Sequence, residues 1–144
     1  MITFLRTIGG WTRGSAVDYD EWAARVGDER YSYKGQLPWF KKSEHWFDNG
    51  NPEQHGQDGP INVTSAKATN RKFPLAEQLA AGWEELGVST LPDGDQNTGD
   101  NLGRAYICEA RSDGKRQWSA SQYSLEGVEV RLETFVNKVV LEQL

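Results

Sequence analysis

Residues 11–60 read WTRGSAVDYDEWAARVGDERYSYKGQLPWFKKSEHWFDNGNPEQHGQDGP, and the other elements are interpreted around this block. It holds four of the six tryptophans, three of the five tyrosines and both histidines, His45 and His55. Glycines and prolines divide it into short segments, which favours several small elements over one long one. The block is therefore expected to contain short helices joined by tight turns.

The spacing predicts a first helix over residues 16–26 that ends at Gly27. Ser15 precedes it, and Asp18 follows three residues later, which resembles a capping box. Four side chains fall on one helical face and form the expected buried stripe: Tyr19, Trp22, Ala23 and Val26.

Ser32 is a second candidate N-cap, and Pro38 is expected to open a further helical turn at its first position. The aromatic residues up to Phe47 would then lie on a short helix. The polar turn residues 48–52 end it, and residues 61–65 alternate as a short strand.

The rest of the chain predicts smaller elements. In order they are a helix from Pro74 to Gly87, a polar loop over 91–103, a strand over 104–111, a helix over 118–125, a strand over 128–132 and a last short strand after Asn137. The sum is one α+β domain over 1–144, with short helices packed on a small antiparallel or mixed sheet.

Charge and composition exclude several classes of protein. The formal net charge is −5 and the pI about 5.1, which argues against a nucleic-acid binder. Cys108 is the one cysteine, so no intramolecular disulfide can form, which is typical of a reducing compartment. No apolar run approaches a membrane span, and Met1–Ile8 is too short for a secretory signal. We expect a cytoplasmic protein without membrane or nucleic-acid partners.

The residues predict no cofactor and no metal. The sequence contains no Gly-x-Gly-x-x-Gly, and one cysteine with two histidines does not form a zinc site. Asp93, Asp95 and Asn97 superficially resemble a calcium loop, but the sixth position is not Gly and the twelfth is Arg104. A solvated loop is the expected reading of this segment.

His55 is the foremost candidate for acid–base chemistry, because a loop histidine can face a cavity and titrates near neutral pH. The alternative, which is the commoner role of a loop histidine, is that it braces its turn by a hydrogen bond to the backbone. We predict a catalytic set of His55, Asp58, Tyr33 and Arg13. The aromatic residues that would line an apolar pocket, or else pack the core, are Trp11, Trp39, Phe40 and Trp46.

Seven segments together resemble a known family. They are TRGSAVDYDEWA (12–23), LPWFKKSE (37–44), HGQDGP (55–60), FPLAEQLAAGWEELGV (73–88), DGDQNTGD (93–100), GKRQWSASQYSL (114–125) and VEVRLETFVNKVVLE (128–142). In order and spacing they are similar to the interior of the glucose-methanol-choline (GMC) flavin oxidoreductases, with fungal members closest. The resemblance extends from Gly9 onward.

The resemblance implies a flavin enzyme, and this sequence departs from that pattern. Family members bind FAD through a Gly-x-Gly-x-x-Gly turn, which is absent here. Their glycine pair is normally followed by Ser-Ser, whereas Gly9-Gly10 runs into Trp11. Neither His45 nor His55 matches the family's catalytic histidine, which lies in its C-terminal region. No flavin-binding or catalytic residue is therefore carried over.

The sequence leads to one main functional hypothesis and three alternatives. The main hypothesis is a cofactor-free, non-redox enzyme of cyclase, isomerase or dehydratase type, derived from a truncated GMC oxidoreductase and acting on a small hydrophobic secondary metabolite. The alternatives are a non-catalytic binding or accessory protein, a degenerate GMC fragment, and a subunit of a split GMC enzyme. A homodimer is expected, because strands of such a fragment would otherwise leave open edges.

Overall fold

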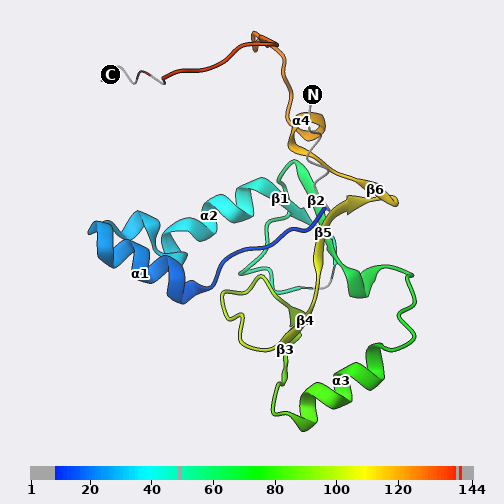
Figure 1. Ribbon diagram of the computed structural model, residues 1–144. Helices are drawn as coiled ribbons and strands as arrows, with labels where there is room; N and C mark the ends of the chain where they lie inside the picture. Colours follow the sequence, from blue (N-terminus) through cyan, green and yellow to red (C-terminus); the bar gives the residue numbers. More distant parts are fainter. Residues whose placement is uncertain (1–8, 49, 139, 141–144) are drawn as a thin grey trace.

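A computed structural model describes residues 9–48, 50–138 and 140, and it confirms the α+β class (Figure 1). The α-helices are α1 (Ala16–Val26), α2 (Tyr33–Ser43), α3 (Ala76–Glu85) and α4 (Ser119–Gln122), and single 3-10 turns lie at η1 (Glu29–Tyr31) and η2 (Ala66–Ala68). The strands are β1 (Glu44–Trp46), β2 (Ile61–Ser65), β3 (Thr90–Asp95), β4 (Arg104–Tyr106), β5 (Cys108–Ser112) and β6 (Lys115–Arg116).

The main sheet is small and mixed, as predicted. Its strand order is β1-β2-β5-β6, with β1 parallel to β2 and the other pairs antiparallel. Val63 lies at its centre, opposite Trp46 on one side and Ala110 on the other. The core cluster consists of Trp46, Ile61, Val63, Cys108 and Ala110, with Trp11 packed against it. A second, two-stranded sheet pairs β3 with β4 in parallel.

Helix α1 has the predicted bounds but not the predicted buried face. Gly27 ends it in the left-handed conformation, with φ of 69°, which glycine adopts without strain. Ser15 makes no side-chain cap, and the first helical N–H, that of Ala16, donates to the carbonyl of Gly99 at 2.8 Å. Of the expected stripe only Ala23 is buried.

Helix α2 differs from the prediction at its start. Ser32 is its N-cap and accepts a hydrogen bond from the N–H of Gly35 at 3.1 Å. A carboxylate oxygen of Asp20 on α1 accepts from the N–H of Tyr33 at 3.0 Å. With both caps fixing the start, Pro38 lies inside the helix, so its predicted place in the opening turn is wrong. The chain turns into β1 at Glu44, so the aromatic run does not continue as a helix.

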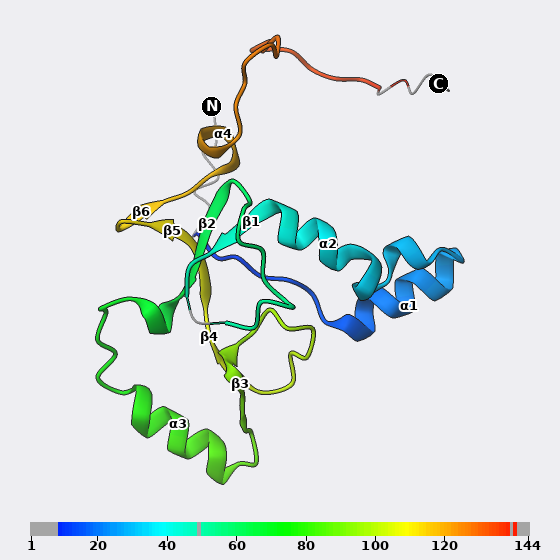
Figure 2. The same ribbon diagram turned by 180° about the vertical axis from the view of Figure 1, so that it is seen from behind.

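Helix α3 lies apart from the main sheet (Figures 1 and 2). The helix itself is confirmed, but none of its residues is buried. Together with the segment before β5 it borders an apolar hollow of about 550 Å³. The large apolar side chains on that hollow include Phe73, Leu75, Leu79, Trp83 and Ile107, and all five are exposed.

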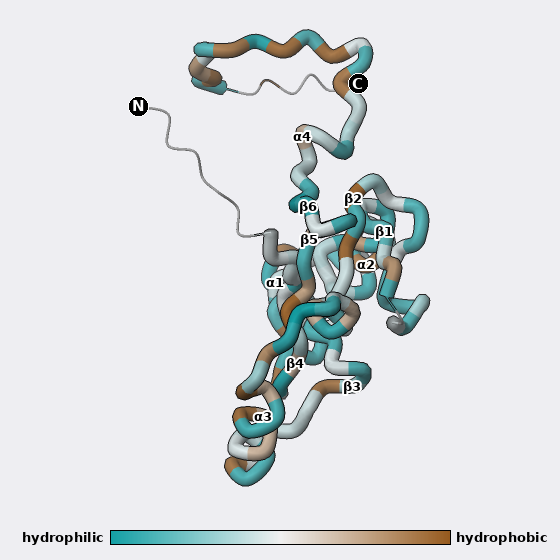
Figure 3. Tube along the Cα trace, turned by 90° about the vertical axis from the view of Figure 1, so that its right-hand side faces the viewer, coloured by the Kyte–Doolittle hydropathy of each residue, from teal (hydrophilic) through white to brown (hydrophobic). Residues whose placement is uncertain are grey.

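The C-terminal part was predicted least well. The expected loop over 91–103 begins as β3, and the helix expected over 118–125 is reduced to α4. The strand expected over 128–132 is wrong: in the described part after α4 the chain forms no regular element. It extends away from the sheet with alternating apolar and polar residues (Figure 3). The last expected strand falls mostly on residues outside the described part.

No helix among the described residues is both long enough and apolar enough to cross a membrane.

Candidate functional site

Four charged side chains lie buried together next to the core. They are Arg13, Glu44, His55 and Asp95, and none is more than 5% exposed. They come from four separate parts of the chain: the segment before α1, the start of β1, the loop before β2 and the end of β3. We call these four residues the buried charge cluster. Charged side chains that are shielded from water in this way need ion-pair and hydrogen-bond partners.

Glu44 is the acceptor at the centre of this cluster. Its Oε1 atom accepts hydrogen bonds from Arg13 Nη2 at 2.6 Å, from the N–H of Gly56 at 3.1 Å and from His55 Nδ1 at 2.9 Å. Its Oε2 atom accepts from the indole N–H of Trp11 at 2.8 Å. One carboxylate thus connects the segment before α1, β1 and the loop before β2.

Asp95 holds the other side of the histidine ring. Its Oδ2 atom lies 2.5 Å from His55 Nε2, and its Oδ1 atom accepts from the N–H of Asn97 at 2.8 Å. Asn97 is fully buried, and its side chain accepts from the N–H of Arg13 at 2.8 Å and donates to the carbonyl of Trp11 at 3.0 Å. The end of β3 is thereby tied to the same segment that Glu44 binds.

The geometry makes His55 an imidazolium. Each ring nitrogen faces a carboxylate oxygen, and both can donate only when both carry a proton. Burial lowers the pKa of His55, but its hydrogen bonds to Asp95 and Glu44 outweigh burial and raise that pKa above its ordinary value. The same hydrogen bond from His55, with that from the Asn97 N–H, outweighs burial and lowers the pKa of Asp95. Two positive and two negative charges then cancel.

Aromatic side chains enclose the cluster. Trp46 stacks on the His55 ring, with 3.8 Å between centroids and 17° between planes. The guanidinium carbon of Arg13 lies 5.3 Å from the centroid of the Phe40 ring. The hydroxyl of Tyr33 lies within hydrogen-bond distance of Gln54 Oε1 at 3.1 Å, and burial raises the pKa of Tyr33. These aromatic faces exclude water from the charges.

The structure brings most of the predicted site residues together. Arg13, Tyr33 and His55 meet around the cluster, along with Trp11, Phe40 and Trp46. Asp58 and Trp39 do not join them. Asp58 is exposed and borders a hollow of about 410 Å³ that His55 also lines, but no hydrogen bond among the described residues connects it to the cluster, and Trp39 is 62% exposed. The catalytic and substrate-binding roles of all eight residues stay predictions, and both ring nitrogens of His55 are already engaged.

Sequence reasoning missed Glu44, Asp95 and Asn97. The expectation of a solvated loop around Asp95 and Asn97 is wrong, because both side chains are buried. Asp95 binds His55, 40 residues away in sequence, and Asn97 binds Arg13, 84 residues away, which is beyond the reach of any periodic pattern. The available signal was chemical: Glu44 lies in the same block as Arg13 and His55, and Asp95 follows Gly94 in a loop rich in acidic and amide side chains.

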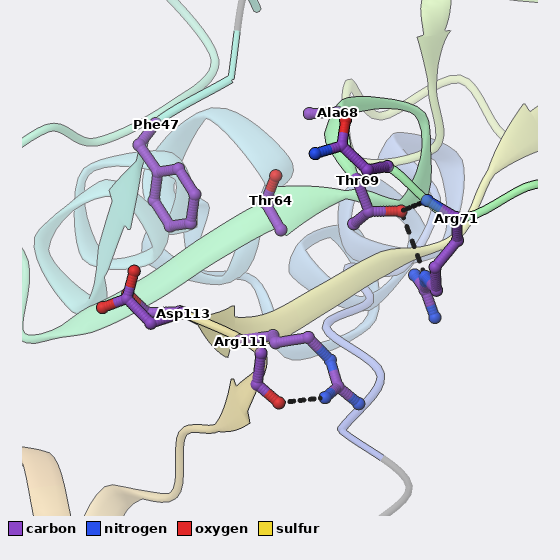
Figure 4. Close-up of a pocket in the computed structure, with 10 residues that line it drawn as sticks. Phe47, Thr64, Ala68, Thr69, Arg71, Arg111 and Asp113 are labelled. Carbon is purple, nitrogen blue, oxygen red and sulfur yellow. Dashed lines mark hydrogen bonds between the residues drawn. The ribbon is translucent and has the colours of Figure 1, made fainter.

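A separate polar hollow of about 620 Å³ lies over β2 and β5 (Figure 4). Phe47 and Asp113 border it at one end, and Arg71 borders it at the other. Arg71 and Arg111 both form ion pairs with Glu109, so their charges are partly neutralised. None of the predicted catalytic residues borders this hollow.

Comparison with known proteins decides the family. The family model described as GMC oxidoreductase matches residues 8–144. The chain belongs to the GMC oxidoreductase family. The resemblance read from the sequence is thus confirmed.

Curated GMC oxidoreductases are much longer than this chain. It is 31% identical over 131 residues to a GMC-type oxidoreductase of Aspergillus aculeatus, covering 91% of this chain and 22% of that protein. It is 50% identical over 83 residues to an oxygen-dependent choline dehydrogenase of Chromohalobacter salexigens, covering 58% of this chain and 14% of that protein. The chain therefore spans less than a quarter of the curated relatives named here.

A solved structure shows the same local fold. Pyridoxine 4-oxidase from Mesorbium loti superposes with a TM-score of 0.69 at 26% identity, covering 81% of this chain and 22% of that one. Together with the family match, this overturns the hypothesis of a cofactor-free cyclase, isomerase or dehydratase. The aromatic block that suggested a new pocket is part of an oxidoreductase fold, and the alternative of a GMC fragment fits better.

The FAD that the family implies does not fit the residues described here. A dinucleotide phosphate is usually held at a free helix N-terminus after a glycine turn. Here Gly10 pairs with Glu109, no helix begins between residues 9 and 15, where the description of the chain starts, and the first N–H of α1 already donates to Gly99. The described part of the chain thus provides no phosphate cradle, and we assign no catalytic step to a flavin held by it.

Proposed function

We propose that this chain works as one segment of a flavin-dependent GMC oxidoreductase whose cofactor is held by other parts of that enzyme. The proposal rests on the family match over residues 8–144 and on the apolar side chains that the fold leaves exposed. It covers the fragment and split-enzyme alternatives and assigns no independent chemistry to this segment.

Bare apolar surface is the observation that carries the proposal. Leu132 and Phe135 of the C-terminal segment are 82% and 86% exposed, and α3 and its N-cap expose Leu75, Leu79 and Trp83. Isolated monomers rarely expose apolar patches of this kind, and such patches mark contact surfaces. Because the matched relatives extend far beyond this segment, the occupant we propose is the remainder of the oxidoreductase. The homodimer expected from the sequence stays a prediction.

The buried charge cluster supports a positioning role for the segment. It fixes the loops before β2 and after β3 relative to the main sheet without using any surface residue. A segment held rigidly from within can present its outer faces to a larger enzyme. We propose that the enzyme oxidises a small polar alcohol, since choline and pyridoxine, named for two similar proteins, are both of this class.

The first experiment asks whether the chain alone binds the cofactor. FAD is titrated into the purified chain and followed by flavin fluorescence. We expect no saturable change, because the described residues offer no phosphate cradle. Tight binding by the chain alone would contradict the placement of the cofactor elsewhere.

The second experiment tests the segment in its proposed context. The segment of the choline dehydrogenase of Chromohalobacter salexigens that corresponds to the family match over residues 8–144 is replaced by those residues of this chain. We expect the hybrid to retain FAD and to oxidise choline, whereas the same hybrid carrying Glu44→Ala should lose soluble, FAD-loaded protein. A hybrid that unfolds cooperatively but retains no FAD would overturn the proposal.

A further inference from the structure

His55 connects parts of the chain that are distant in sequence. One ring nitrogen binds Glu44, which holds Arg13 and Trp11 of the segment before α1. The other ring nitrogen binds Asp95, whose neighbour Asn97 holds the same segment. The ring can donate a hydrogen bond to both carboxylates only when both of its nitrogens carry a proton.

We propose that the imidazolium of His55 is a pH-dependent latch: while it carries its second proton it connects Asp95 at the end of β3 to Glu44 of the main sheet, and loss of that proton to solvent breaks this connection. The inference concerns the fold of this chain and does not depend on the proposed function.

Deprotonation would break one of the two contacts of the ring. A neutral imidazole donates from one nitrogen only, so the other nitrogen would face a carboxylate oxygen at 2.5 or 2.9 Å with no proton between them. The cluster would also change from neutral to a single uncompensated negative charge. In a site whose members are at most 5% exposed, such a charge is strongly unfavourable.

The groups around the ring cannot replace the lost charge. Glu44 of β1 and Asp95 of β3 face it directly, and the guanidinium of Arg13 beside them is already paired with Glu44. Burial raises the pKa of Tyr33 on α2, and it raises the pKa of Cys108 on β5 to about 12. These two groups therefore stay neutral near physiological pH.

Three further charged groups border the hollow that His55 also lines: Lys41, Lys42 and Asp58. The ammonium of Lys41 already donates to the carbonyls of Pro52 and Glu53. Lys42 and Asp58 are exposed, so water screens their charges. Within the described part of the chain, the second proton of His55 is thus the one that decides the charge of the cluster.

The direction of the pH effect follows from the raised pKa of His55. Stability from the latch is fully present below the ordinary histidine pKa of about 6.5, and it is lost as pH rises through the raised pKa. Between these two values the folded chain binds one more proton than the unfolded chain. The equilibrium constant for unfolding should therefore rise about tenfold for each pH unit in that interval.

The test combines stability with direct observation of the ring in the full chain. Urea unfolding is measured against pH for the wild type, for His55→Gln and for His45→Gln. His45 is the other histidine of the sequence and has its ring beside Phe47, 6.5 Å between centroids. We expect His45→Gln to keep the tenfold rise per pH unit and His55→Gln to lose it. The same rise in His55→Gln would overturn the proposal.

A second measurement covers the case in which His55→Gln does not fold. Nitrogen NMR of the imidazole rings gives the titration midpoint of His55 in the wild type and in Asp95→Asn. We expect a wild-type midpoint above about 6.5 and a lower midpoint in Asp95→Asn, because one carboxylate partner is neutral. Amide exchange at Asn97 and Gly56, whose N–H groups donate to Asp95 and Glu44, should accelerate beyond its intrinsic pH dependence above the wild-type midpoint. A wild-type midpoint at or below the ordinary value would refute the latch.

Discussion

At the scale of single residues, Glu44 determines whether the buried charge cluster can form. Its carboxylate accepts from Arg13, His55, Trp11 and the N–H of Gly56, and its side chain is fully buried. Neutralising it leaves two cations without a shared partner in a site closed to water. Breaking a buried ion pair in this way is far more costly than breaking an exposed one.

Glu44→Gln is therefore expected to lower the free energy of unfolding by about 3–5 kcal/mol. The matched control is Glu21→Gln, which removes the exposed pair between Glu21 and Arg25 on α1 and should cost about 0.3–0.5 kcal/mol. Urea denaturation at neutral pH measures both. Similar losses in the two variants would contradict the central place of Glu44.

Residue types alone led to part of this site. His55, Arg13 and Tyr33 were identified because histidine, arginine and tyrosine are the usual carriers of polar chemistry. Their carboxylate partners were missed, since the contact between Arg13 and Glu44 spans 31 residues and that between His55 and Asp95 spans 40. Such contacts arise from sheet topology, which local spacing does not encode.

At the scale of elements, close packing around the loop before β2 limits what can replace its glycines. A Cβ atom on Gly56 would lie 1.8 Å from the carbonyl oxygen of Lys41 at the end of α2. A backbone oxygen cannot move away without displacing the helix. The loop and the end of α2 therefore need glycine here for steric reasons.

Gly56→Ala should accordingly lower the free energy of unfolding by about 3 kcal/mol. Gly82→Ala is the matched control, because Gly82 is exposed on α3 and a Cβ there meets no atom within 4 Å. Alanine in a helix interior should instead raise stability by about 0.5–1 kcal/mol. Thermal unfolding measures the stability of the two variants. An equal change in stability in both would contradict the steric explanation for Gly56.

Elements with strong local signals were predicted well. Gly27 ends α1 at the expected residue, and α3 lies within its predicted span. Pro38 was misjudged because the start of α2 is fixed by Ser32 and by Asp20 from another helix. The strand expected over 128–132 has an alternating pattern but no partner among the described strands, and a strand needs one to form.

At the scale of the whole molecule, the apolar C-terminal segment determines how the isolated chain behaves. Leu132 and Phe135 contact little of the rest of the chain, so they add little to its stability but offer surface for association. The double variant Leu132→Ser with Phe135→Ser should therefore bind less hydrophobic dye and self-associate less. Its urea midpoint should match that of the wild type.

Sedimentation velocity over a range of concentrations and dye fluorescence measure these effects. Thr134→Ser, in the same segment, keeps a hydroxyl and serves as the control. Association that is as strong in the double variant as in Thr134→Ser would exclude this segment as the adhesive surface. The exposed face of α3 would then be the next surface to change.

The burial of the charge cluster also determines how the chain should respond to salt. Dissolved ions screen exposed pairs, such as those of Arg25 with Glu21 and Arg131 with Glu129, but they act far less on groups shielded from water. Raising the ionic strength should thus weaken the surface pairs and leave the Arg13–Glu44–His55–Asp95 network almost unchanged. The response of an ion pair in this fold to the surrounding solution thus depends on its depth: the exposed pairs sense the ionic strength, and the buried network does not.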